Sequence, residues 1–387
     1  MSQSTEDALE LCKSSVETVQ ATLVLFNSVE KLSSTLGALG PLIGVAAAIM
    51  KLALGGVDSP EMAFMKEQFQ AVRNQLDVIS GQISKVLQEI SRSTMENQYF
   101  RIQENIKSQF RKYMDILRAA PEYRQKEKEE FLKHFDETKT DQNLHSLYDG
   151  VMGFTGCFGK SILDTAMDSS ERNRRLMESL CAALKKLFCV GVIALVGHAA
   201  ITGNDAKALE VEWNEKLARV EGRMNSMISR CIYEFEEQAR MDVNKWVQCK
   251  GGRDNRECSS YVLNQLVQKY NWVHWSVRVY DPVHAYANHC VIGCHYFHFF
   301  RHNGVNIVVS YTTNPSPVDE FRIRQLMKGK EHWSDPKKVV DHIHGNLPGH
   351  VVHVVRRYKN LWYASNFPGT CHFWENYSGV TLCVHRE

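Results

Sequence analysis

Cysteine and histidine side chains in the last third of the chain are the residues whose types and spacing could carry chemistry. Cys258 stands where a helix is expected to begin, in the stretch ECSSYVLNQL. A helix N-terminus lowers the pKa of a thiol and favours attack by the thiolate. His284, His289 and His295 follow, an order that some compact cysteine hydrolases use. One hypothesis is therefore a thiol hydrolase at Cys258, and the alternative is an ordinary cysteine near a helix cap.

A second group of possible ligands lies further along, in HCVIGCHYFH. Cys290, Cys294 and His298 share one face if this stretch is a single strand. Zinc uses such sulfur and nitrogen ligands, but the Cys-x2-Cys spacing that marks a zinc site is absent. His342 and His344 would likewise share a face of a strand. We expect neither a metal nor a cofactor, and interpret these histidines as half-buried strand residues.

Composition narrows the class of protein. The chain has 387 residues, 44% of them hydrophobic, and a formal net charge of +2, so it is globular and gives no electrostatic reason to bind nucleic acid. The opening residues lack a basic start followed by an apolar stretch, so no secretory signal is expected. We therefore expect a protein of the cytoplasm, or one held peripherally or integrally at a membrane.

Prolines and histidines divide the chain into two parts. No proline lies between residues 122 and 281, and six follow, while thirteen of the sixteen histidines lie beyond residue 270. Because proline breaks helices and strand-rich segments need turns, we predict a helical bundle over 1–249 and a small β-rich, α+β domain over 250–387.

The most apolar segment of the helical part is 36–57, LGALGPLIGVAAAIMKLALGGV. About 20 apolar residues suffice to cross a bilayer, so the segment could be hidden in one state and enter a membrane in another. A buried core helix would also be apolar on all faces. The residues expected to meet lipid, with Lys51 snorkelling or lining an aqueous path, are Leu39, Leu42, Ile43, Val45, Ile49, Lys51, Leu52 and Leu54. A second apolar segment, 187–201, suits a core helix.

A regular apolar seam follows this segment. Its period of three and four residues is typical of helices packed side by side, and one helix is predicted from about 60 to 118. The seam residues are Met65, Phe69, Val72, Leu76, Ile79, Ile83, Val86 and Ile90. Exposed, such a seam would support coiled-coil contacts with partner helices or with further copies of the chain.

The last part of the chain is typical of strands separated by turns. Six stretches are rich in β-branched and aromatic residues: 272–280, 294–300, 306–313, 350–358, 361–367 and 380–385. A short helix is expected over 259–270. The aromatic residues of this domain form its core or, where exposed, recognise a protein partner or a lipid headgroup.

The apolar tract and the run EMAFMKEQFQAVRNQLDVISGQIS that follows it resemble the rapunzel proteins of bony fish. More distantly, they resemble the helical part of cephalotoxin-like proteins and, in architecture, α-pore-forming toxins built from long helices. The resemblance covers about residues 5 to 250. It implies a non-enzymatic, membrane-associating or pore-forming-toxin-like protein with a link to development. An intracellular scaffold and the Cys258 hydrolase are the alternatives.

Overall fold

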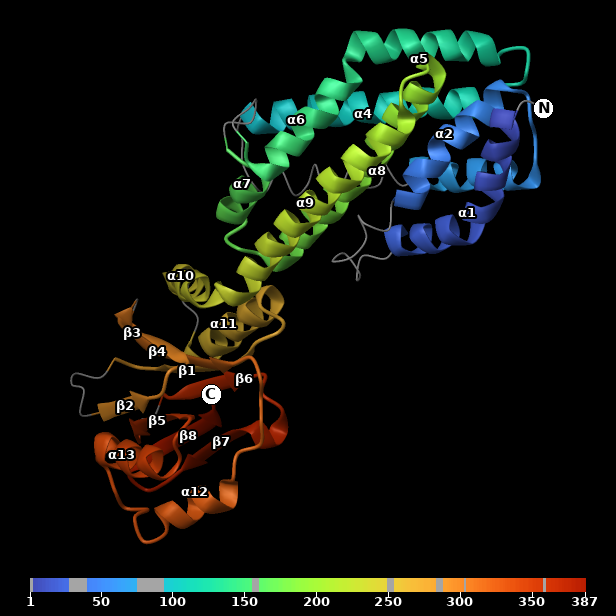
Figure 1. The fold of residues 1–387 in the computed structure, drawn as a ribbon. Coiled ribbons are helices and arrows are strands. Elements are labelled where there is room, and N and C mark those ends of the chain that lie inside the picture. Colours follow the sequence, from blue (N-terminus) through green and yellow to red (C-terminus); the bar gives the residue numbers. More distant parts are fainter. Residues whose placement is uncertain are drawn as a thin grey trace. The chain divides into compact units, whose positions relative to one another are not determined.

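The computed structural model describes residues 3–27, 40–74, 94–154, 160–248, 254–282, 288–302, 304–357 and 360–387. The chain divides into two compact units, Met1–Tyr233 and Glu234–Glu387, here called the helical unit and the C-terminal unit (Figure 1). A mainly helical chain that ends in a β-rich unit confirms the predicted fold class. The predicted boundary at 249/250 lies too late, because α10 (Phe235–Gln248) packs its buried side chains into the core of the C-terminal unit.

The helical unit contains nine described helices. They are α1 (Gln3–Asn27), α2 (Gly40–Leu54), a helix over residues 60–74, α4 (Thr94–Arg118), α5 (Arg124–Thr138), α6 (Thr140–Met152), α7 (Ile162–Ser169), α8 (Arg174–Thr202) and α9 (Ala206–Tyr233). The Asn173 side chain caps α8 by accepting a hydrogen bond from the Leu176 amide at 3.3 Å, and Gly203, with φ +79°, ends it.

One apolar core fills this unit, and α8 lies at its centre. Helix α8 packs against α2, α4, α6, α7 and α9, and Figure 1 shows α8 and α9 side by side. The seam predicted over 60–118 contributes Met65, Phe69 and Val72, which are fully buried. The other seam residues lie outside the described part of the chain: Leu76, Ile79, Ile83, Val86 and Ile90.

The C-terminal unit is built from two antiparallel four-stranded sheets. The first sheet has the order β3 (Tyr296–His302), β4 (Val305–Thr312), β1 (His274–Tyr280), β6 (Trp362–Ser365). The second has the order β2 (His289–Ile292), β5 (His350–Arg356), β8 (Val380–Arg386), β7 (His372–Asn376). Its remaining elements are α11 (Asn255–Lys269), α12 (Glu320–Met327), α13 (Pro336–Asn346) and a 3-10 turn (Gly369–Cys371).

Alternation along the strands makes this unit four layers deep. On β1, Trp275, Val277 and Val279 pack with α10 and α11, while Arg278 points the other way, toward the second sheet. Val352 and Val354 on β5 pack with α12 and α13. Side chains between the two sheets form the inter-sheet layer. Each sheet is thus covered by helices on its outer face and by the other sheet on its inner face.

All six predicted strands are present, but four elements were missed: β2, β7, α12 and α13. His342 and His344 do not share the face of a strand, because both belong to α13. Asp335 caps that helix through the Lys337 amide at 3.0 Å, and Pro336 occupies its first turn. Val339, Val340 and Ile343 then bury one helical face, which outweighs the strand-like composition.

Candidate functional site

The apolar segment singled out in the sequence forms α2, and most of its residues are inside the helical unit. Ile43, Val45, Ile49 and Leu52 are at most 1% exposed, Leu54 is partly buried and Lys51 is exposed. Leu39 and the side chain of Leu42 lie outside the described part of the chain. The fifteen residues of α2 are about 22 Å long, less than the ~30 Å thickness of a bilayer's hydrocarbon core.

Helix α8 is the one described helix that is long and apolar enough to cross a membrane. It has 29 residues, about 43 Å, and 89% of its most apolar window is buried. The segment predicted over 187–201 is therefore the C-terminal half of a longer helix. Length and composition alone do not distinguish a membrane span from the core helix of a globular protein. The packing of α8 is therefore the more informative property.

Two glycines allow neighbouring helices to approach α8 closely. A Cβ atom at Gly197 would lie 2.4 Å from Cε2 of Tyr113, and one at Gly191 would lie 2.6 Å from Cδ1 of Leu144. Both distances are far below van der Waals contact, so neither position accepts a side chain unless its neighbours move. Gly197 in particular fixes the position of the Tyr113 ring between α4 and α8.

Two polar side chains attach α2 to the surrounding bundle; we call Tyr113 and Arg124 the clasp residues. The Tyr113 hydroxyl donates to the Ala46 carbonyl at 3.0 Å, and burial raises the pKa of this phenol. Arg124 Nη1 donates to the Ala53 carbonyl at 2.9 Å, and its Nη2 lies 3.6 Å from Asp58. Carbonyls in the last turn of a helix lack intrahelical partners and carry negative partial charge, so a guanidinium stabilises this end of α2.

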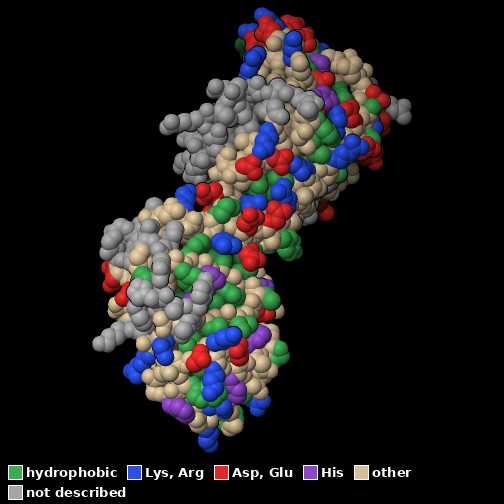
Figure 2. Space-filling model, turned by 90° about the vertical axis from the view of Figure 1, so that its left-hand side faces the viewer, with side chains coloured by type: hydrophobic (Ala, Val, Ile, Leu, Met, Phe, Trp, Pro, Cys, Tyr) green, Lys and Arg blue, Asp and Glu red, His purple; other side chains and the backbone are tan. Residues whose placement is uncertain are grey.

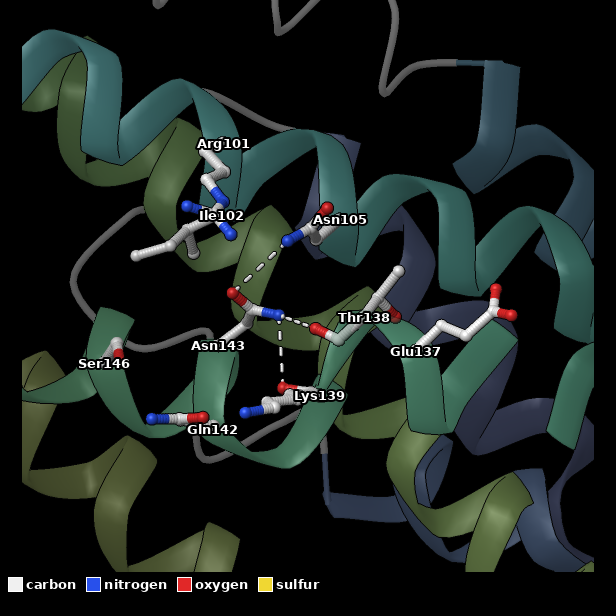
Figure 3. Close-up of a pocket in the computed structure, with 9 residues that line it drawn as sticks. All are labelled: Arg101, Ile102, Asn105, Glu137, Thr138, Lys139, Gln142, Asn143 and Ser146. Carbon is white, nitrogen blue, oxygen red and sulfur yellow. Dashed lines mark hydrogen bonds between the residues drawn. The ribbon is translucent and has the colours of Figure 1, made fainter. Parts of the chain in front are cut away.

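A polar hollow of about 490 Å³ lies between α4 and the corner that joins α5 to α6 (Figure 3). Its amide side chains bond to each other and to backbone carbonyls of the corner. Asn143 donates to the carbonyls of Thr138 and Lys139, and Asn105 donates to Asn143 at 3.4 Å. Lys139 takes a left-handed conformation, φ +47°, at the junction. These bonds hold a helix corner, so we assign no ligand to the hollow.

The predicted ligands of a weak metal site are separated in the C-terminal unit. Cys290 packs with the core beneath α13, and Cys294 is exposed in the turn between β2 and β3. His298 lies in the other sheet and stacks on Phe300 at 4.2 Å. Cys290 and His298 do not lie on a single strand, because a turn at Gly293, φ +141°, sends the chain from one sheet to the other. Among the described residues, no group of histidine, cysteine and acidic side chains suits a metal.

The proposed nucleophile Cys258 lies in the apolar core between α11 and the first sheet, 2% exposed. Of the histidines considered with it, His284 lies outside the described residues. His289 occupies the inter-sheet layer, on the opposite face of the first sheet, where its ring packs on Tyr280 at 5.8 Å. The fold therefore puts Cys258 and His289 on opposite sides of a sheet.

Sequence reasoning missed a different cysteine. Cys383 on β8 lies 3.2 Å from Nε2 of His372 and 3.2 Å from Nη1 of Arg278, inside the inter-sheet layer. The signal was the alternation of Ser276, Arg278 and Tyr280 with apolar neighbours on β1. Such a polar face ordinarily points to solvent, and here a second sheet covers it.

Comparison with known proteins gives two matches and one absence. A family model for the cephalotoxin-like middle helical domain matches residues 56–252, about half of the chain. Protein rapunzel of Danio rerio is 39% identical over 203 residues, which make up 52% of this chain and 89% of that protein. No solved structure matches the chain.

Proposed function

Because the chain belongs to the rapunzel family and carries the cephalotoxin-like middle helical domain, we propose that its helical unit associates with lipid membranes by releasing α2 and α8. One observation carries the proposal: the two most apolar helices pack against each other in the centre of the unit. On the face in Figure 2, acidic and basic side chains are interspersed over the helical unit. The apolar helices α2 and α8 are thus buried beneath a charged surface.

The two helices would contribute differently to a membrane-bound state. Helix α8 is long enough to span the hydrocarbon core. Helix α2 is too short to span it, so it would insert partly or lie at the interface. Lys51, already exposed, would reach the headgroups at the end of α2. We further propose that several chains assemble into a pore. The membrane surface on which they act would be a cytoplasmic one.

Release of α2 requires that the contacts of the clasp residues break. A buried hydroxyl-to-carbonyl bond contributes about 1 kcal/mol, and a bond from a charged donor about 1.5–3 kcal/mol. Variants that remove these bonds while leaving the apolar packing intact should favour the released state. Val45→Asp is a poorer probe, because Val45 is 1% exposed and a buried carboxylate would unfold the bundle.

The test is flotation of the full-length protein with liposomes of neutral or anionic lipid, together with dye release. The double variant Tyr113→Phe/Arg124→Gln should bind and leak more than wild type at equal protein concentration. The matched control is Tyr99→Phe/Arg118→Gln. Tyr99 is buried on the same helix with an unpartnered hydroxyl, and Arg118 is exposed. Circular dichroism must show that both variants are folded.

The alternative function is an intracellular scaffold in which α2 and α8 stay buried and partners bind elsewhere. The 89% burial of the apolar window of α8 favours it, since core helices are buried to this degree. Absence of flotation for wild type and for the clasp variant, with both folded, would reject the membrane proposal and leave the scaffold. In either case, exposed aromatic residues of the C-terminal unit, Trp362 and Phe321, are where we would look for a protein partner.

A further inference from the structure

Arg278, in the middle of the inter-sheet layer, is a buried permanent charge. Its side chain is 0% exposed, and a guanidinium stays protonated in proteins. Its Nη1 donates to Ser276 Oγ at 3.1 Å and to Cys383 Sγ at 3.2 Å, and its Nη2 donates to Ser310 Oγ at 2.9 Å. None of these hydrogen-bond partners is a carboxylate. A buried cation needs a compensating charge, and Cys383 is the one partner here that can supply it.

The surroundings of Cys383 favour its ionised form. Burial alone would raise the pKa of this thiol, but His372 and Arg278 outweigh burial and lower the pKa to about 6. His372 Nε2 also lies 2.9 Å from Ser276 Oγ, which fixes the ring beside the sulfur. The other titratable neighbours are neutral: burial lowers the pKa of His353, opposite Cys383 on β5, and lowers that of His385, on β8, to about 3.

A thin aromatic cover separates this cluster from solvent. Cys383 is 2% exposed, whereas Tyr363 on β6 is 42% exposed and stacks on His372, with ring centroids 5.9 Å apart, and on Trp374 at 4.0 Å. Phe367 packs on the other side of His372 at 5.3 Å. Tyr363 is thus the exposed member of the ring stack over His372, so a small neutral molecule would have to pass these rings to reach the sulfur.

We propose that Cys383 is a buried thiolate centre that small hydroperoxides oxidise to a sulfenic acid. The thiolate sulfur bonds to one peroxide oxygen, the O–O bond breaks, and the departing hydroxide or alkoxide is protonated from solvent. The sulfur loses two electrons and the peroxide gains them, giving water or an alcohol. Oxidation removes the negative charge that faces Arg278, so the modification acts on the contact that joins the two sheets.

The pH dependence of the oxidation tests the ionised state. Full-length protein is treated with hydrogen peroxide, sulfenic acids are trapped with dimedone, and labelled peptides are quantified by mass spectrometry. The Cys383 rate should reach half its plateau near pH 6, while Cys12, whose pKa burial raises to about 11, stays unlabelled at neutral pH. Labelling of Cys383 that appears only above pH 8, or only in denaturant, would contradict the proposal.

Two variants test separately the electrostatic effect of His372 on the Cys383 thiol and the steric effect of Tyr363 on access to it. His372→Gln should move the half-plateau pH upward by about one unit or more, since one of two lowering influences is lost. Tyr363→Ala should speed oxidation by bulky cumene hydroperoxide far more than oxidation by hydrogen peroxide. Trp362→Ala, the neighbouring exposed aromatic on the same strand, is the matched control and should change neither rate.

If His372→Gln or Tyr363→Ala fails to fold, a comparison of wild type with Cys383→Ser still tests the proposal. The ultraviolet absorbance of thiolate, titrated in wild type and in Cys383→Ser, should differ by one ionising group with a midpoint near pH 6. Identical titration curves below pH 8 would overturn the proposal. This inference concerns the C-terminal unit and does not depend on membrane binding.

Discussion

The two units bury very different interiors. The helical unit buries one continuous apolar core, with polar contacts such as those of Tyr113 and Arg124 to backbone carbonyls and the Lys185–Glu221 ion pair at its edge. The inter-sheet layer of the C-terminal unit instead buries a guanidinium, a thiol and several histidines. An apolar core resists charge at any pH, whereas a layer of titratable groups is stable only while those groups keep one protonation state. We propose that the first interior can be exchanged for lipid and that the second responds to protons and oxidants.

The largest expected effect is that of a charge placed in the apolar core. Val45→Asp should unfold the helical unit or destabilise it by more than about 3 kcal/mol, because Val45 is 1% exposed within the apolar core. Lys51→Asp, at an exposed position of the same helix, should cost less than about 1 kcal/mol. Thermal unfolding followed by circular dichroism measures both. Equal stability of the two variants would mean that Val45 is not in the core.

Acid should destabilise the C-terminal unit through the buried histidines of its inter-sheet layer. Burial lowers the pKa of His289 to about 4 and that of His385 to about 3, while both would titrate near 6.5 when unfolded. Between pH 6.5 and 4 the unfolded chain therefore binds more protons, so stability present above pH 6.5 is lost as the pH falls. We expect a loss of a few kcal/mol, at about 1.4 kcal/mol per pKa unit.

The matched variants for this prediction are His289→Phe and His332→Gln. The first removes a buried titrating ring and should flatten the fall of the melting temperature below pH 6. The second changes an exposed histidine and should leave the curve as in wild type. A C-terminal unit whose melting temperature is constant from pH 7 to pH 4 would contradict the neutral, buried state of these rings.

A smaller effect should come from one methyl group beside α8. Gly197→Ala would place its Cβ against the Tyr113 ring, and the resulting shift should cost about 1–3 kcal/mol. Gly222→Ala, in α9 with open space around the new Cβ, should stabilise by up to about 1 kcal/mol through helix propensity. Chemical denaturation should show a lower free energy of unfolding for Gly197→Ala and a higher one for Gly222→Ala. Changes of the same sign would contradict the close packing of Tyr113 on α8.

The smallest effect compares two buried tyrosines on α4. Tyr113→Phe should cost about 1 kcal/mol, since it removes the bond to Ala46. Tyr99→Phe removes a hydroxyl that has no partner and should be neutral or slightly stabilising. Urea unfolding resolves the difference; equal costs would show that the hydroxyl of Tyr113 does not hold α2.

Periodicity predicted the elements whose pattern is local. The apolar residues of α2 and the alternation on β1 could be recognised without a structure, because helix and strand patterns depend only on residues that are close in the sequence. The inter-sheet layer could not, since it depends on which strands pair: Cys383 meets His353 across β5 and β8, thirty residues apart. The Asp335-Pro336 start of α13 is a readable helix signal, but no helix was predicted there.

The sequence predicted one membrane-inserting segment, whereas the function proposed from the structure uses a pair of helices, α2 and α8. Lipid-facing residues were assigned to 36–57 alone, while the helix long enough to span a bilayer is α8. Its start after the Asn173 cap extends it thirteen residues before the predicted segment 187–201. The clasp could not be foreseen, because a tyrosine or arginine bonding a backbone carbonyl 67 or 71 residues away leaves no pattern in the sequence.

Hydrogen exchange of the full-length protein with and without liposomes tests the central claim most directly. If α2 and α8 leave the bundle for the bilayer, their amides stay protected by lipid and by their own helices. Peptides from α4, α6 and α9, which lose their packing partners, should exchange faster. That pattern should be stronger in Tyr113→Phe/Arg124→Gln than in wild type. Unchanged exchange in α4, α6 and α9 for both proteins, at liposome concentrations that permit binding, would contradict the account and mean that α2 and α8 remain a permanent core.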